Sequence, residues 1–224
     1  SVPAKAYSGV SALTGSSADT VSPVGCHLLP CTISDRGVVD TALSSFFSSL
    51  GKWELVLSQD VRYKYFIDRP VVPGTQFNYR FPGADVPLYL PDAAISSLLQ
   101  LANNVGRRFG IKEKFDVVGA AHFVSDRSRL PPHRDGDVHC SDPDKLVLSL
   151  SWEVDCTFLL RGDSFSLRAG TWMLFSGAWS HGVLPGCKGR VSFTFRRWDR
   201  VPHHPTLPSR AGVGRWRGDR ECEA

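Results

Sequence analysis

The sequence has no run of 18 or more apolar residues, so it offers no candidate for a membrane-spanning helix. Its N-terminal segment also lacks the basic start and the apolar stretch of a secretory signal peptide. The six cysteines include no CxxC pair, and a chain of 224 residues does not need disulfides to fold. We therefore expect reduced thiols in an intracellular, cytoplasmic protein.

Methionine is nearly absent, because Met173 is the only one and residue 1 is serine. We interpret the sequence as a processed chain or as a domain cut from a larger protein, such as a polyprotein. The hydrophobic fraction of 42% and the charged fraction of 21% are typical of a globular protein. A net charge of +4 allows a polyanionic partner without requiring one, and we assume a monomer.

The length allows one domain with flexible ends. Residues 1–35 are rich in Ser, Ala, Gly, Pro and Thr, which predicts a flexible N-terminal arm. Residues 199–224 are dominated by Pro, Gly, Arg and His, which predicts a disordered tail. The folded domain is then expected over residues 36–198.

Two helices are predicted ahead of a series of short strands. Residues 40–50 could form a short amphipathic helix, and a clearer helical period starts at Pro91-Asp92 and stops at Gly110. The β-like runs, separated by turn residues, are 117–124, 146–152, 156–160, 164–167, 171–175 and 191–197. Because helices and strands do not alternate regularly, we predict an α+β fold: a β-sandwich or jelly roll with helices supporting one face.

His133 and Asp135 form the first chemical motif, at the predicted end of a strand. Alternate strand residues point to the same side, so one imidazole and one carboxylate can bind the same ion. His181 follows another predicted strand and can supply a second imidazole, a ligand set that leaves three positions on iron open. The alternatives are a solvated loop for the HxD pair and a hydrogen-bonded core histidine for His181.

Nine residues beyond His181, polar side chains alternate with apolar ones. The polar set is Arg190, Ser192, Thr194 and Arg196, and the apolar set is Val191, Phe193 and Phe195. Arginines that face the inside of a barrel are costly unless an anion binds there, and arginine suits a dicarboxylate. The alternative is an edge strand whose polar face lies in water.

Together, the HxD pair, the distal histidine and the R-x-S-x-T-x-R run resemble the AlkB-like branch of the 2-oxoglutarate/Fe(II)-dependent dioxygenases. The resemblance covers residues 60–197. It implies a double-stranded β-helix (jelly-roll) core and dioxygen as a further co-substrate. It also implies that His133, Asp135 and His181 are the catalytic metal ligands. Arg190 would bind the distal carboxylate of 2-oxoglutarate, and Arg196, Ser192 and Thr194 would help to hold this co-substrate.

Three positions depart from the family pattern. Ser192 stands where the family usually has Asn, and Phe123 stands where a tyrosine often contacts the co-substrate. Asp135-Gly136-Asp137 replaces the commoner acidic run. None of these changes removes a metal ligand. The implied reaction is the oxidative removal of N-methyl groups from nucleic acid, with release of formaldehyde, succinate and CO2.

The segment between residues 62 and 81 interleaves aromatic and basic side chains, so we predict a nucleotide lid over residues 60–90. The expected substrate contacts are Arg62, Tyr63, Lys64, Tyr65, Tyr79 and Arg80. An alternative to the lid is almost equally favoured. It is a pair of strands whose aromatic side chains pack in the core and whose basic side chains lie in water. RNA is preferred over DNA as the substrate, because an excised domain poor in methionine is similar to the AlkB domains of RNA-virus replication polyproteins.

Two other functions remain open from the sequence. One is the same chemistry on a protein side chain or a small molecule, for which the basic aromatic segment would be merely structural. The other is a catalytically silent jelly-roll module that binds a ligand and no iron.

Overall fold

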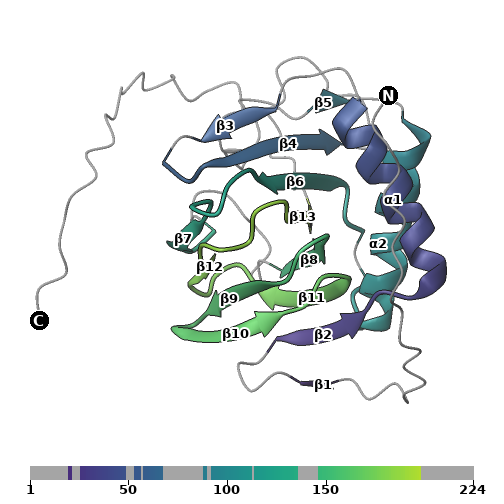
Figure 1. Ribbon diagram of the computed structural model, residues 1–224. Helices are drawn as coiled ribbons and strands as arrows, with labels where there is room; N and C mark the ends of the chain where they lie inside the picture. The colour runs from purple at the N-terminus through teal and green to yellow at the C-terminus, as the bar shows by residue number, and fades with distance from the viewer. Residues whose placement is uncertain are drawn as a thin grey trace, which may run out of the picture.

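The computed structural model describes residues 20–21, 26–48, 53–56, 58–67, 88–89, 92–112, 114–135 and 146–197. These residues form two sheets that are antiparallel except for one short strand, with two helices on the outer face of the larger sheet (Figure 1). The α+β class with a jelly-roll core and supporting helices is therefore confirmed. Neither helix is long and apolar enough to cross a membrane.

The larger sheet has nine strands among the described residues. Its order is β1 (Thr20–Val21), β2 (His27–Pro30), β11 (Thr171–Ser176), β8 (Leu146–Trp152), β13 (Val191–Arg196), β6 (Val117–Phe123), β4 (Val61–Ile67) and β3 (Glu54–Val56). β5 (Leu88–Tyr89) pairs with β4 in parallel. The smaller sheet has the order β10 (Asp163–Leu167), β9 (Cys156–Leu160), β12 (His181–Val183) and β7 (Leu130–His133).

The helices α1 (Ile33–Ser48) and α2 (Ala93–Arg108) pack against each other along the larger sheet (Figure 1). α2 begins where the sequence predicts it, because the Asp92 carboxylate accepts hydrogen bonds from the backbone N–H groups of Ala94 and Ile95. Its buried stripe consists of Ile95, Leu98, Leu99, Ala102 and Val105. This stripe joins the core between the helices and the sheet.

Strand alternation separates two cores. On β13, Phe193 and Phe195 belong to the core that the helices cover. Ser192 and Thr194 point to the opposite face, where they line a cavity between the sheets. The alternation predicted for this strand is therefore confirmed, and the cavity lies inside the jelly roll.

The N-terminal boundary of the folded part was predicted too late. Strand β2 lies within the expected arm, yet it pairs with β11 as a full member of the larger sheet. Helix α1 begins at Ile33 rather than near residue 40. The folded part therefore starts before residue 36, while the predicted tail, 199–224, lies outside the described residues.

Candidate active site

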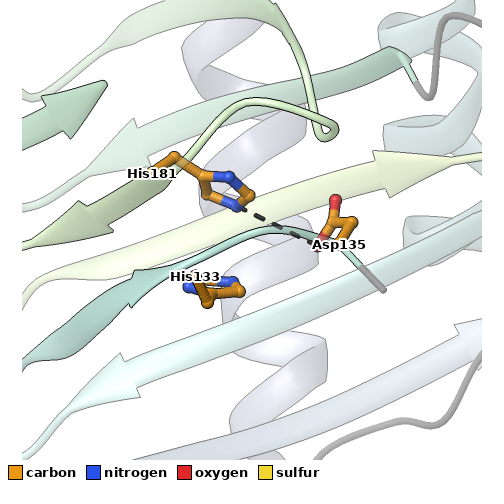
Figure 2. Close-up of side chains that lie close together, drawn as sticks. All are labelled: His133, Asp135 and His181. Atoms are coloured by element: carbon orange, nitrogen blue, oxygen red, sulfur yellow. Dashed lines mark ion pairs between the residues drawn. The ribbon is translucent and has the colours of Figure 1, made fainter. Parts of the chain in front are cut away.

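The three predicted metal ligands come together in space (Figure 2). His181 opens β12 and lies directly opposite His133, the last residue of β7, in the strand register. Asp135 follows two residues after His133. The ligand atoms of the three side chains all lie within 4.8 Å of one another, and His181 Nε2 is 3.9 Å from Asp135 Oδ1. Two imidazoles and one carboxylate thus face a common point, which is the donor set that iron(II) uses in oxygenases.

Both imidazoles are oriented by their own backbone. Nδ1 of His133 lies 2.9 Å from the carbonyl oxygen of Pro131, and Nδ1 of His181 lies 2.9 Å from that of Trp179. A carbonyl oxygen only accepts, so each Nδ1 carries the proton and donates it. The Nε2 lone pair of each ring is left available to a metal, because the outer hydrogen bond fixes the tautomer.

The charge states of the site also suit a metal. Burial lowers the pKa of His181 to about 4, although the nearby Asp135 opposes this shift, so the imidazole is neutral at pH 7. Burial tends to raise the pKa of Asp135, but Arg196 and the two histidines outweigh it, and the pKa lies below its ordinary value. Metal ligands must be deprotonated, and both groups already are.

Asp135 is held by two neighbours as well as by its place in the chain. Arg196 Nη1 donates to Asp135 Oδ2. The backbone N–H of Asp135 donates to the carbonyl oxygen of Gly177 at 2.8 Å. A Cβ atom at Gly177 would overlap the Asp135 carboxylate, so only glycine allows this approach.

Replacing Gly177 by alanine should therefore displace Asp135. We expect iron affinity to fall about 10-fold to 100-fold, the range seen when a partner that orients a ligand is lost. The measurement is the iron content of the variant after anaerobic loading. Gly37→Ala is the matched control, because Gly37 lies in α1 with open space around its Cβ position. That change should leave iron binding intact and stabilise the fold by roughly 0.5–1 kcal/mol. Equal iron content in the two variants would contradict the role of Gly177.

The ligands open into a cavity between the two sheets. It has about 660 Å³ of empty space, including its opening to solvent. β13 and the residue before it contribute Arg190, Ser192, Thr194 and Arg196, the polar set expected from the sequence. The lining also includes aromatic side chains and the two histidines of the triad: Tyr63, Tyr65, Phe123, His133, Phe158, Phe175 and His181.

Among the cavity residues, Arg190 indicates most directly what the cavity binds. Its side chain is only 1% exposed, and its Nη1 atom is buried without a hydrogen-bond partner. No carboxylate of the described residues forms an ion pair with it. A buried cation without a counter-ion is costly, and a bound carboxylate would offset that cost. This buried nitrogen and the ligand triad therefore fit iron(II) together with a dicarboxylate such as 2-oxoglutarate.

No protein-family model and no curated protein sequence matches the chain. Solved structures do resemble it. OsALKBH1 has 18% identity and a TM-score of 0.49, and the match covers 80% of this chain and 100% of that one. A 2OG-Fe(II) oxygenase family oxidoreductase from Burkholderia pseudomallei has 16% identity and a TM-score of 0.49, covering 78% and 84%. A prolyl-4-hydroxylase from Pseudomonas putida has 17% identity and a TM-score of 0.48, covering 78% and 94%. The TM-scores of these three structures are all below 0.5, so none of the three carries an argument about the function of this chain.

The predicted co-substrate residues lie in the cavity but differ in their contacts. Arg190 is free to bind an anion, whereas Arg196 is engaged with Asp135. Ser192 is buried, and Thr194 Oγ1 lies 3.5 Å from the carbonyl oxygen of Gly119. Arg196 thus contacts Asp135 as well as lining the cavity, and its contact with the co-substrate stays a prediction.

The expected substrate residues do not share one surface. Tyr63 and Tyr65 line the cavity, but strand alternation turns Arg62 and Lys64 to the other face of β4. Arg62 is exposed there. Tyr79 and Arg80, like the rest of 68–87, lie outside the described residues.

Lys64 does not make the phosphate contact that the sequence predicted for it. Its side chain is 3% exposed, and Nζ donates to the carbonyl oxygen of Phe46 at 3.0 Å, near the end of α1. Nζ also lies over the rings of Trp53 and Phe66, at 5.6 and 5.7 Å from their centroids. Burial lowers the pKa of this ammonium. Lys64 therefore holds a helix end against the sheet and does not face the cavity.

Two site residues were missed in the sequence. Ser151 Oγ accepts a hydrogen bond from Arg190 Nε, and Gly177 makes room for Asp135. Serines at alternate positions of the otherwise apolar run 146–152 were the available signal for the first. No local signal indicated Gly177, since its role depends on a contact across the fold.

Proposed function

We propose that this chain is a 2-oxoglutarate- and Fe(II)-dependent dioxygenase that removes methyl groups from alkylated nucleic acid, with RNA preferred over DNA. The observation that carries the proposal is the buried, unpartnered Nη1 of Arg190, in the same cavity as two metal-ligand histidines. A metal triad alone would suit many ions. A triad beside a buried arginine suits a metal that shares its site with a dicarboxylate.

His133, Asp135 and His181 would hold iron(II), which together with 2-oxoglutarate and dioxygen would supply the oxidising chemistry. The chain's own residues prepare the site for it. Arg196 fixes one carboxylate oxygen of Asp135, so the other oxygen faces His181. Arg190 offers its guanidinium to the far carboxylate of the co-substrate.

Two buried aromatic side chains cover one side of the metal site. Phe175 and Phe158 pack on the His181 ring, with centroids 4.9 and 6.5 Å away, and both phenylalanines are buried. A dry site strengthens the electrostatic contacts inside it and protects a reactive oxidant from side reactions. This wall supports oxidation of a bound carbon rather than simple hydrolysis.

The geometry of Tyr63 and Tyr65 is an argument for a planar substrate. Their rings are parallel within 2°, with centroids 6.3 Å apart, and both line the cavity. The Tyr63 hydroxyl donates to Gln59 Oε1 at 2.6 Å, which fixes its ring. Fixed aromatic faces stack on nucleobases, and stacking tolerates many base types. The preference for RNA depends on the resemblance to domains of viral replication polyproteins.

The test is formaldehyde release from matched methylated oligonucleotides, RNA and DNA, with iron(II), 2-oxoglutarate and ascorbate. Methylated peptides serve as the comparison. Release from RNA above DNA and peptide is the expected result. Turnover of 2-oxoglutarate without release from any oligonucleotide would instead favour a protein or small-molecule substrate. No turnover and no iron binding would favour a silent binding module.

Replacing Tyr63 or Tyr65 by alanine should weaken binding of the methylated oligonucleotide by about 1–3 kcal/mol for each stacked base lost. The salt dependence of binding should not change, since no phosphate contact is removed. Uncoupled 2-oxoglutarate consumption should persist, because neither side chain is a metal ligand.

Arg62→Ala is the matched control on the same strand, since this exposed side chain faces away from the cavity. Binding should be measured at two salt concentrations, with a thermal melt for each variant. Stable tyrosine variants with wild-type affinity would assign both rings to the scaffold.

A further inference from the structure

The guanidinium of Arg190 is supported from two sides. Its central carbon lies 4.9 Å from the centroid of the Phe123 ring, and its Nε donates to Ser151 Oγ at 3.0 Å. All three side chains are 1% exposed. The ring covers one face of the guanidinium and the hydroxyl accepts from Nε, while Nη1 is buried without a hydrogen-bond partner.

The backbone sets this arrangement. The N–H of Phe123 donates to the carbonyl oxygen of Arg190 at 3.0 Å, and the N–H of Gly189 donates to the carbonyl oxygen of Phe123 at 2.8 Å. Phe123 and Arg190 are thus neighbours on adjacent antiparallel strands, at the point where β6 ends and β13 begins. These two bonds set Gly189 and Arg190 opposite Phe123 as a β-bulge, with Gly189 at a φ of 86°. Phe123 and Arg190 both line the cavity, so the ring meets the guanidinium on the cavity face.

The ring also compensates for a charge. Among the described residues no carboxylate pairs with Arg190, so the buried cation depends on neutral partners. A guanidinium over an aromatic face gains up to about 2 kcal/mol when both groups are desolvated. Phe123 can therefore keep the cation buried and ordered before any anion arrives.

A guanidinium that is already held in place binds a carboxylate more tightly than a mobile one does. A long side chain loses rotamer entropy when it is fixed by a ligand, and a fixed partner removes that cost. We propose that Phe123 is a positioning residue, which sets the affinity for the dicarboxylate co-substrate by holding Arg190 against Ser151. This inference rests on the proposed function, since it assumes that 2-oxoglutarate is the anion.

The experiment measures 2-oxoglutarate binding by calorimetry on the full chain, loaded with Mn(II) in the absence of dioxygen. Phe123→Met keeps an apolar side chain of similar size but removes the ring face. We expect its 2-oxoglutarate affinity to fall about 10-fold. Phe123→Tyr keeps the ring and should bind 2-oxoglutarate no more weakly than wild type. Mn(II) affinity should stay unchanged in both variants.

A double-mutant cycle shows whether Phe123 acts through Arg190. In the Arg190→Lys background, Phe123→Met should have little further effect on 2-oxoglutarate affinity, because the guanidinium is already gone. Phe165→Met is the matched control: this phenylalanine packs on Phe158 and does not line the cavity. If the Phe123 variants fail to fold, Ser151→Ala tests the other contact that holds Arg190. This variant should also weaken 2-oxoglutarate binding.

The outcomes separate this inference from the proposed function. Wild-type protein that does not bind 2-oxoglutarate would overturn both. Wild-type binding that is unchanged in a folded Phe123→Met protein would overturn the inference and leave the proposed function standing. Equal losses in the Phe123→Met and Phe165→Met variants, or an additive effect in the Arg190→Lys background, would also contradict positioning through Arg190.

Discussion

Replacing Asp135 by alanine is expected to abolish turnover of 2-oxoglutarate and to remove stoichiometric iron binding. The physical reason is that Asp135 supplies the one carboxylate of the ligand set, and its charge partly neutralises the metal. Arg196 magnifies the effect. Without the carboxylate, this partly buried cation would lie close to the metal position and would lose its ion pair with Asp135.

Metal content after anaerobic loading measures the binding, and succinate formation measures the turnover. His181→Ala should give the same loss, because it removes an imidazole whose Nε2 faces Asp135. Asp163→Ala is the matched control, since that exposed aspartate lies on β10 and outside the cavity. Full activity with normal iron content in the His181→Ala protein would refute the assignment of the metal centre.

Six strands were predicted from the sequence, and β13 shows why this was possible. Strand β13 alternates between the helix-covered core and the cavity, so its period of two is visible in the sequence. Strands β8 and β9 were predicted with the bounds that the structure has, Leu146–Trp152 and Cys156–Leu160. Turn residues between these runs marked their ends.

The start of helix α1 was missed although the sequence contained a signal. The N–H of Thr32 donates to Asp35 Oδ2 at 3.1 Å, and the N–H of Asp35 donates to Thr32 Oγ1 at 3.2 Å. This reciprocal pair is a capping box with aspartate in place of the usual glutamate. Gly37, inside the first turns, lowers helix propensity and conceals the period.

The metal ligands were found because two of them share a local motif and the third follows a strand. The partner of Arg196 could not be found in this way, because the contact with Asp135 joins segments 61 residues apart. The sequence also could not show which face of β4 lines the cavity. Alternation groups Tyr63 with Tyr65, and Arg62 with Lys64, but only the packing of α1 shows which pair faces the cavity.

Replacing Arg190 by lysine should raise the 2-oxoglutarate concentration required for half-maximal turnover by about 100-fold, a value within the range for truncating one partner of a buried charge pair. Lysine keeps the charge but loses the planar fork that binds a carboxylate through two nitrogens. It also loses the hydrogen bond from Nε to Ser151 Oγ and the flat contact with Phe123. Iron binding should survive, because Arg190 contacts none of the ligands in this structure.

The measurement is initial succinate formation over a wide range of 2-oxoglutarate concentrations, with metal content determined on the same sample. Arg168→Lys is the matched control, because Arg168 is exposed and lies outside the cavity. A shift confined to the 2-oxoglutarate requirement, with iron content unchanged, would place the distal carboxylate at Arg190. If Arg190→Lys kept the wild-type requirement, the anion would bind elsewhere. Arg196 would be the next candidate, and its engagement with Asp135 predicts that Arg196→Lys would disturb iron binding as well.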